Sequence, residues 1–179
     1  MAALPIRIYG DRALRRKSEP VREITPQVRK LAEDMIKTMY DAPGIGLAAA
    51  QVGVFKRLFV IDPAFGEEKG KAFALINPVV RPVDRNEQVL IEEGCLSVPE
   101  VRADVLRPAR ITVEYRNLAG ETIRLEAEEL LARVIQHEND HLDGILFVDR
   151  LTPVKRQLLG KQLRAMARSQ QRRKVQAAA

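Results

Sequence analysis

Hydrophobic residues recur with a helical period near the start of the chain. Between residues 26 and 41 the apolar side chains that share one face are Val28, Leu31, Met35 and Met39. Thr25 and Pro26 suit the cap and the first position of such a helix. The run Asp-Ala-Pro-Gly at 41–44 predicts its end.

A second helical period runs through Leu130, Val134, His137 and His141, in steps of 4, 3 and 4 residues. It predicts a helix over 126–142 whose apolar stripe, with the two histidines in line with it, points inward. Glu128 and Glu129 would suit its positive N-terminus, and Gly144 would end it. Thr152 and Pro153 predict the start of a final helix.

Between these helices lie short runs with β character, at 57–61, 73–76 and 89–91, separated by Pro and Gly residues. The runs 111–115 and 122–125 flank turn residues at 117–120 and predict a hairpin. The expected fold is α+β, with antiparallel or mixed β-sheets packed around the central helix and a C-terminal helix. We expect one domain, with residues 1–150 forming its main body and 151–179 its basic C-terminal helix and tail.

The chain contains two histidines, and both lie in the run His-Glu-Asn-Asp-His at 137–141. On a helix this spacing puts two imidazoles on one face, where both can bind one divalent metal. Glu138 would then lie beside a water molecule at the metal and could take its proton. The alternatives are two solvated histidines or a pair of hydrogen-bonded histidines in the core.

A third ligand must come from another residue type, and the only cysteine is Cys95. A lone cysteine is often a small buried apolar residue. However, Gly94 allows close approach of the backbone, and Pro99 is expected to end the extended segment soon afterwards. One thiolate and two imidazoles would leave a tetrahedral position open, as in catalytic rather than structural zinc sites.

A third segment of interest is Gly-Ile-Gly-Leu-Ala-Ala-Ala-Gln at 44–51. Its small residues could simply form tightly packed core. Its spacing matches neither the dinucleotide-binding nor the phosphate-binding glycine motif, so no nucleotide cofactor is expected. Gln51 stands out as a long amide at the end of a run of small residues.

Taken together, the segments 44–51, 93–97 (Glu-Gly-Cys-Leu-Ser) and 136–141 (Gln-His-Glu-Asn-Asp-His) resemble the three motifs of peptide deformylase in order and spacing. The resemblance covers about residues 5–150. It implies hydrolysis of the formyl group on N-formylmethionyl peptides, with release of formate. Each motif is moderately specific, and their combination is very specific.

The resemblance also implies roles for individual residues. Cys95, His137 and His141 would hold one divalent metal. Glu138 would take a proton from water and deliver it to the departing amine. Gln51 and the backbone N–H of Leu96 would donate hydrogen bonds to the developing oxyanion. Glu93 would support the metal site as the carboxylate next to a ligand.

Residues matching the family's substrate pocket are weaker candidates, because most also suit an ordinary core. Arg133 is expected at the solvent side of the pocket and Arg102 near the path of the peptide. The remaining positions are Ile45, Gly46, Ile91, Leu130 and Val134.

The donor set suits zinc, but iron, nickel and cobalt are also compatible with it. The resemblance implies Fe²⁺ in the cell. The family pattern is departed from at Ala50, where threonine or proline is common, and at 10–12, where a turn containing two prolines is common. Neither departure removes a chemical group that the reaction needs.

Composition is that of an ordinary globular protein, with 179 residues, 46% hydrophobic and 30% charged. The first twenty residues lack an uninterrupted apolar stretch for export, and no segment is long enough to span a membrane. A single cysteine agrees with a reducing compartment. The cytoplasm is the simplest location, and an organelle reached by a transit peptide is the alternative.

Positive charge is concentrated at the C-terminus. Of 30 Lys and Arg residues nine lie from Arg150 onward, where there is no Asp or Glu, so residues 1–149 carry 21 basic against 24 acidic residues. This segment is either a solvated helix and tail or a polyanion-binding element. Because the basic C-terminal helix of deformylases is implicated in ribosome docking, the resemblance favours the ribosome as partner.

Three other functions are compatible with parts of the sequence. A general zinc metallohydrolase would need a later ligand, for which Asp143 and Asp149 are available. A structural-metal module that binds RNA would use the basic segment, and a copper electron-transfer site could use two His and one Cys. The helical spacing with an adjacent glutamate fits hydrolysis better.

Overall fold

The computed structural model of the protein describes residues 3–62, 64 and 72–177. Across these residues the fold is α+β, as predicted, with two sheets and three α-helices. The helices are α1 (Pro26–Asp41), α2 (Glu129–Leu142) and α3 (Pro153–Ala177). The strands are β1 (Gly46–Ala48), β2 (Leu58–Ile61), β3 (Phe73–Pro82), β4 (Gln88–Cys95), β5 (Val98–Pro108), β6 (Arg110–Arg116) and β7 (Thr122–Glu128). Short 3₁₀ helices span Arg12–Arg15, Ala49–Val52 and Phe147–Asp149.

The larger sheet is antiparallel, with strand order β1-β2-β3-β6-β7. Its central strands are buried on both faces because α1 packs on one face and α2 on the other. Successive side chains of β2 alternate between these layers, so Leu58 faces α1 whereas Phe59 faces α2. The amphipathic pattern of residues 26–41 therefore marks the face of α1 that covers the sheet.

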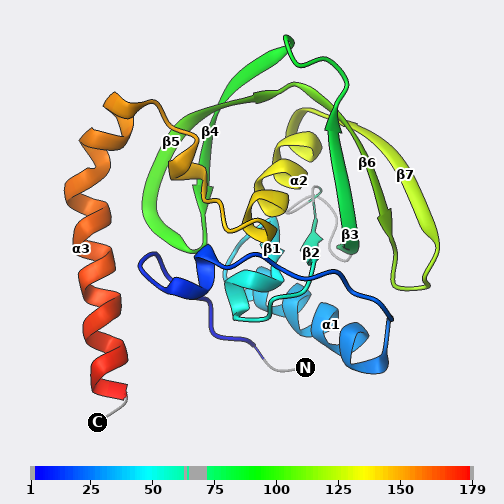
Figure 1. Ribbon diagram of the computed structural model, residues 1–179, viewed down its shortest axis with the longest axis horizontal. Coiled ribbons are helices and arrows are strands. Elements are labelled where there is room, and N and C mark those ends of the chain that lie inside the picture. Colours follow the sequence, from blue (N-terminus) through cyan, green and yellow to red (C-terminus); the bar gives the residue numbers. More distant parts are fainter. Residues whose placement is uncertain (1–2, 63, 65–71, 178–179) are drawn as a thin grey trace.

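The second sheet is the hairpin β4–β5, which turns through Leu96 and Ser97, with Cys95 paired with Val98. Figure 1 shows α2 between this hairpin and the larger sheet. The C-terminal end of β4 thus comes beside the middle of α2. That placement brings the cysteine segment to the histidine helix.

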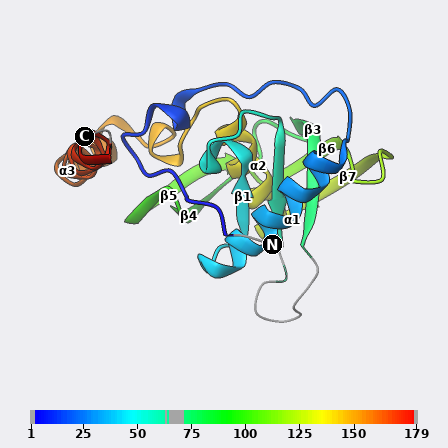
Figure 2. The ribbon, with the colours of Figure 1, turned by 90° about the horizontal axis from the view of Figure 1, so that it is seen from below.

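Helix α3 lies at one end of the molecule, beside β5 (Figures 1 and 2). Leu163 is buried against the cluster that includes Val101 and Phe147. Lys155 pairs with Asp104, and Gln162 donates a hydrogen bond to the carbonyl of Glu100. None of the described helices combines the length and apolar character that crossing a bilayer requires.

The structure confirms α1, the 111–125 hairpin and the start of α3, and it corrects other boundaries. Residues 126–128 continue β7, because Glu128 pairs with Arg110 across the sheet. Glu129 then turns the chain with φ +50° and begins α2. Glu128 is therefore the residue before the helix and not part of its first turn.

Two further expectations about local structure were wrong. Pro99 does not end the extended segment, because β5 runs through it from Val98 to Pro108. Leu130 does not point into the core, since it is 48% exposed in the first turn of α2. The inward stripe of this helix begins at Val134 and continues through His137 and His141, all of which are buried.

Candidate metal centre and pocket

Three possible metal ligands converge between β4 and α2. The ligand atoms of Cys95, His137 and His141 all lie within 4.8 Å of one another. The Sγ atom of Cys95 is 3.2 Å from Nε2 of His141. The two imidazoles come from one face of α2, with ring centroids 5.1 Å apart, as the spacing of four residues predicts.

These residues fit a divalent transition metal. The Nδ1 atom of His137 is 2.9 Å from a carboxylate oxygen of Glu93, which leaves Nε2 for the common centre. A carboxylate on the far nitrogen of a ligating histidine is the usual arrangement in metal sites. A thiolate and two imidazoles would suit zinc, iron, nickel or cobalt, and three protein donors are the number typical of catalytic rather than closed structural zinc sites.

The later carboxylates proposed as alternative ligands lie elsewhere. Asp143 pairs with Arg57, with an N–O distance of 2.8 Å. Asp149 pairs with Arg15 and Arg156. Neither belongs to the cluster of possible ligands found among the described residues, so Cys95 is the third donor that the fold supplies.

Glu93 is held by a buried network of cations. The guanidinium of Arg107 donates to both of its carboxylate oxygens at 2.7 and 3.0 Å, and Arg133 donates at 2.9 Å. Burial alone would raise the pKa of Glu93, but hydrogen bonds with His137 and Arg107 hold it well below its usual range. Glu93 is therefore an ionised acceptor for His137.

The surroundings shift the pKa values of the two histidines in opposite directions. Burial tends to lower the pKa of His137, but hydrogen bonds with Cys95 and Glu93 raise it well above the ordinary value. Burial lowers the pKa of His141, and its Nδ1 atom has no hydrogen-bond partner among the described residues.

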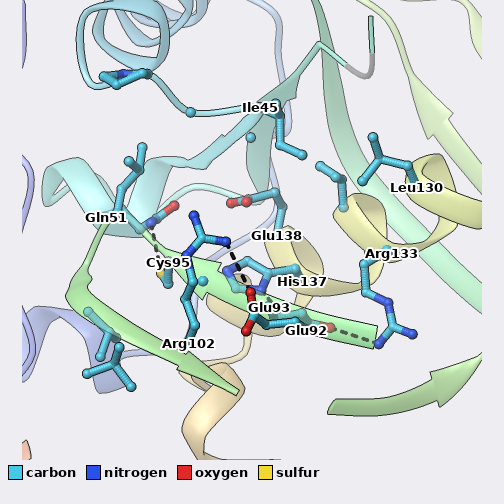
Figure 3. Close-up of a pocket in the computed structure, with 18 of the residues that line it drawn as sticks. Ile45, Gln51, Glu92, Glu93, Cys95, Arg102, Leu130, Arg133, His137 and Glu138 are labelled. Atoms are coloured by element: carbon cyan, nitrogen blue, oxygen red, sulfur yellow. Dashed lines mark hydrogen bonds and ion pairs between the residues drawn. The ribbon is translucent and has the colours of Figure 1, made fainter. Parts of the chain in front are cut away.

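Glu138 is buried next to the three donors and lines the pocket. Burial raises its pKa to about 7. Its Oε2 atom has no hydrogen-bond partner within the described part of the chain. Figure 3 shows Glu138 and His137 projecting from α2 into the pocket, with Gln51 and Cys95 close together at its other side. The carboxylate is thus placed and poised to exchange a proton near neutral pH.

Gln51 is fixed in orientation by its neighbours. Its Oε1 atom accepts a 2.7 Å hydrogen bond from the N–H of Ala48. Its amide nitrogen therefore faces the other way, 3.2 Å from Oγ of Ser97 and 3.6 Å from Sγ of Cys95. Leu96 also lines the pocket, on the turn between β4 and β5.

A cavity of about 640 Å³ adjoins the donors. Its apolar wall includes Ile45, Leu130 and Val134, and Gly46 also lines it. Ile91 is not among its lining residues and is 39% exposed on β4. Arg102 lies at the rim, 3.5 Å from Glu92, and both side chains are largely exposed.

Arg133 was expected at the solvent side of the pocket, and the structure corrects this. Its side chain is buried, donating to Glu93 and to the carbonyls of Val89 and Val105. The guanidinium therefore joins α2 to both strands of the hairpin. Arg133 lines the pocket, and these hydrogen bonds to Glu93, Val89 and Val105 hold its guanidinium in place.

Sequence reasoning missed Ser97, Arg107 and Asp140. Arg107 bridges Glu93 and Asp140 from β5. This strand contains four charged residues and two prolines, so its sequence does not show a regular β pattern. Asp140 was visible inside the histidine motif, but its spacing gave no indication of an ion pair across the fold. Ser97 is a small polar residue, and its contact with Gln51 depends on the turn of the hairpin, which the sequence pattern does not predict.

Comparison with known proteins agrees with this geometry. A family model described as polypeptide deformylase matches residues 3–157. A peptide deformylase of Acinetobacter baumannii is 47% identical over 175 residues, which is 98% of each chain. One from Acidobacterium capsulatum is 45% identical over 94% of this chain and 98% of its own.

Solved structures show the same fold. The peptide deformylase of Thermus thermophilus superposes with a TM-score of 0.85 at 44% identity, covering 96% of this chain and 99% of that one. A Synechococcus elongatus peptide deformylase in complex with actinonin gives a TM-score of 0.84 at 42% identity, covering 90% of this chain and 89% of that one.

Proposed function

Because the chain belongs to the polypeptide deformylase family, we propose that Cys95, His137 and His141 hold its metal and that Glu138, Gln51 and Leu96 act on the substrate. The enzyme is a metal-dependent hydrolase that removes the formyl group from the N-terminal formylmethionine of nascent polypeptides and releases formate. This assignment sets aside an electron-transfer protein and a structural-metal RNA-binding module. The observation that carries the proposed site is the convergence of the three donor atoms within 4.8 Å beside Glu138.

A divalent ion at this position supplies Lewis acidity, which polarises a carbonyl group and makes water more acidic. Glu138 takes the proton from the attacking water, and its pKa near 7 suits both taking and returning a proton. The same carboxyl then delivers the proton to the amine that departs as the new N-terminus.

The oxyanion needs hydrogen-bond donors that are already oriented. The amide of Gln51 is turned toward the reaction centre because Ala48 holds its oxygen. We propose that this amide and the backbone N–H of Leu96 donate to the oxygen of the formyl group. The contacts of Gln51 with Cys95 and Ser97 support this role, since they keep the amide nitrogen at the edge of the pocket.

We propose that the methionine side chain occupies the slot lined by Ile45, Leu130 and Val134. An exposed apolar residue such as Leu130 gains stabilisation when a ligand covers it. Gly46 and Arg102 would contact the peptide, as at the matching family positions. Arg133 contributes to the wall through its buried pairings, whereas Ile91 has no place in this slot because it does not line the cavity.

We propose Fe²⁺ as the metal in the cell, with zinc, nickel and cobalt as replacements that the donor set accepts. The presence of a thiolate ligand supports a transition metal over magnesium or calcium. We propose that the enzyme works in the cytoplasm, because nascent formylated chains arise where ribosomes translate.

The ribosome is the proposed docking partner of α3. The nine basic residues from Arg150 onward have no acidic neighbour in that segment, which favours a polyanion such as ribosomal RNA. We propose that 1–150 form the catalytic unit and that 151–179 belong to the same domain. The burial of Leu163 against β5 and the 147–149 segment supports this.

The test uses formyl-Met-Ala-Ser with released formate as the readout. We expect the wild-type enzyme to release formate and Glu138→Ala to lose activity by about 10²–10⁴-fold while it keeps its metal. Glu114→Gln, which changes an exposed acid on β6, is the control and should match wild type. Glu138→Ala with wild-type turnover would overturn the assignment of the proton-transfer residue.

A further inference from the structure

A continuous chain of charged contacts leads from His137 to the base of α3. The Nδ1 atom of His137 is 2.9 Å from Glu93, and Nε of Arg107 is 2.7 Å from the other oxygen of Glu93. The Nη1 atom of Arg107 is 2.7 Å from Asp140. Asp140 in turn accepts from Nε and Nη2 of Arg150 at 3.0 and 2.5 Å. Arg150 lies between the 3₁₀ helix Phe147–Asp149 and α3.

Most residues in this series of contacts are buried. Glu93, Arg107 and Asp140 are 5%, 4% and 6% exposed. Taking such charges out of water is costly unless each has well-oriented partners of opposite sign. Arg150 is the outermost member, with 44% of its side chain exposed. Its two donors close the network on the solvent side.

Asp140 has no part in the reaction as described above. It lies on α2 between the two histidine ligands, yet its carboxylate is turned away from the metal centre and toward Arg107 and Arg150. Asp140 holds Arg107 at Nη1, whereas Glu93 accepts from the other two nitrogens of the same guanidinium. Asp140 is itself held by Arg150.

We propose that Asp140 and Arg150 are positioning residues for the metal ligand His137, acting through Arg107 and Glu93. The inference rests on the metal site of the proposed function. With the carboxylate of Asp140 held by Arg150, the guanidinium of Arg107 is shared between two carboxylates. Glu93 then remains a strong acceptor for the Nδ1–H of His137, which fixes the ring and makes its Nε2 a better ligand.

Because Arg107 is shared between Glu93 and Asp140, the direction in which each substitution changes metal affinity can be predicted. Without the charge of Asp140, Arg107 pairs with Glu93 alone and withdraws more of its acceptor strength from His137. Removing Arg150 acts by another route: the charge of Asp140 stays, but its position is no longer fixed, so Arg107 and Glu93 orient the His137 ring less firmly. Loss of either group therefore lowers metal affinity without touching a ligand.

The chain offers a matched control in Arg156. Arg156 is also basic, near the start of α3 and 48% exposed, but it pairs with Asp149 at 3.2 Å and has no contact with Asp140 in any described interaction. Arg150→Ala and Arg156→Ala therefore change net charge equally, and only the first breaks the chain of contacts to Glu93.

The experiment measures Co²⁺ affinity of the metal-depleted full-length protein by competition with a chelator. We expect about tenfold weaker binding for Asp140→Asn and about threefold for Arg150→Ala, with Arg156→Ala equal to wild type. Arg150→Lys should restore part of the loss, since a lysine keeps the charge but not the two-pronged geometry. The ligand-field absorption of bound Co²⁺ should shift in Asp140→Asn and not in Arg156→Ala.

A merely structural role gives a different result. It would lower the unfolding temperature of the metal-depleted Arg150→Ala protein but leave its Co²⁺ affinity and absorption unchanged, and that outcome overturns the proposal. If Asp140→Asn does not fold, the Arg150→Ala and Arg150→Lys pair decides the question alone. Failure of wild type to bind Co²⁺ would instead contradict the proposed metal site itself.

Discussion

The carboxylate of Glu138 lies directly against the backbone of Gly46. A Cβ atom added at residue 46 would come within 2.5 Å of Oε1 and 2.9 Å of Cδ of Glu138. Real Cβ atoms do not approach other atoms so closely, so the absence of a side chain on β1 sets the position of the proposed proton-transfer group.

Gly46→Ala should therefore lower kcat by moving the carboxylate. A misplacement of about 1 Å at a reacting group can cost about 10²-fold in rate. We expect a loss of that order in formate release from formyl-Met-Ala-Ser, with a smaller change in KM. Gly160→Ala on α3, far from the pocket, is the control and should keep wild-type kinetics. A Gly46→Ala enzyme as fast as wild type would show that Glu138 reorients at no cost.

Cys95→Ser should reduce metal retention, because a hydroxyl is a harder and less acidic donor than a thiol. The measurement is metal content per chain after passage through a chelating column, for protein purified without oxygen. Ser97→Ala removes a neighbouring hydroxyl that contacts the amide of Gln51 and should retain metal. Equal metal content in Cys95→Ser and wild type would point to a third ligand other than Cys95.

The identity of the metal affects survival in air. Iron next to a thiolate can pass to the ferric state, whereas nickel at the same site resists oxidation. We expect activity of the iron-loaded enzyme to decay in air faster than that of the nickel-loaded enzyme. Deformylation assays after timed exposure measure the two rates, and equal decay would contradict Fe²⁺ as the source of oxygen sensitivity.

The basic face of α3 can be tested without removing the helix. Arg168→Gln with Arg172→Gln takes two exposed charges from its C-terminal half. We expect weaker cosedimentation with ribosomes and a shallower salt dependence, by about one unit per lost phosphate contact. Hydrolysis of a short formyl peptide should not change. Arg81→Gln with Arg124→Gln, equal in charge but located on β3 and β7, should bind ribosomes as wild type does.

Acid should loosen the junction before α3. Burial raises the pKa of Asp149, but hydrogen bonds from Arg15 and the N–H of Leu146 outweigh it and lower the pKa below 3.8. A lowered pKa means that the stabilisation is complete above the unfolded value and is lost as pH falls through the folded one. Because Asp149 is partly exposed, the contribution is at most about 1 kcal/mol. Unfolding temperatures of Asp149→Asn and wild type should converge below about pH 4, and a constant difference down to pH 2 would contradict this account.

The elements that the sequence predicted are those with one buried face, because burial on one face gives their hydrophobic residues a regular spacing. Residues 26–41 and the histidine helix show a period of 3.6 because α1 and α2 each cover one side of a sheet. The two histidines of the candidate metal site were predictable because they lie one helical turn apart. Cys95 was predictable from its motif rather than from any local pattern.

The remaining features depend on pairing across the fold. β5 carries four charged residues, Glu100, Arg102, Asp104 and Arg107, so its sequence does not resemble a buried strand. Arg107 is nevertheless buried there because acids from β4 and α2 neutralise its charge. The apolar step at Leu130 predicted burial, but this residue faces a cavity instead of a neighbouring element. Interactions of this kind depend on tertiary distances, which periodicity along one segment does not contain.

The order of the donor atoms along the chain has a consequence for biosynthesis. Residue 95 emerges from the translating ribosome well before residues 137 and 141, so the thiol exists for a time without the imidazoles that will join it in the centre. During that interval it is an ordinary free sulfhydryl, open to oxidation or to stray ions. The proposed centre is complete only after the last turn of α2 has been made, so we expect metal loading to be a late event in the maturation of each molecule.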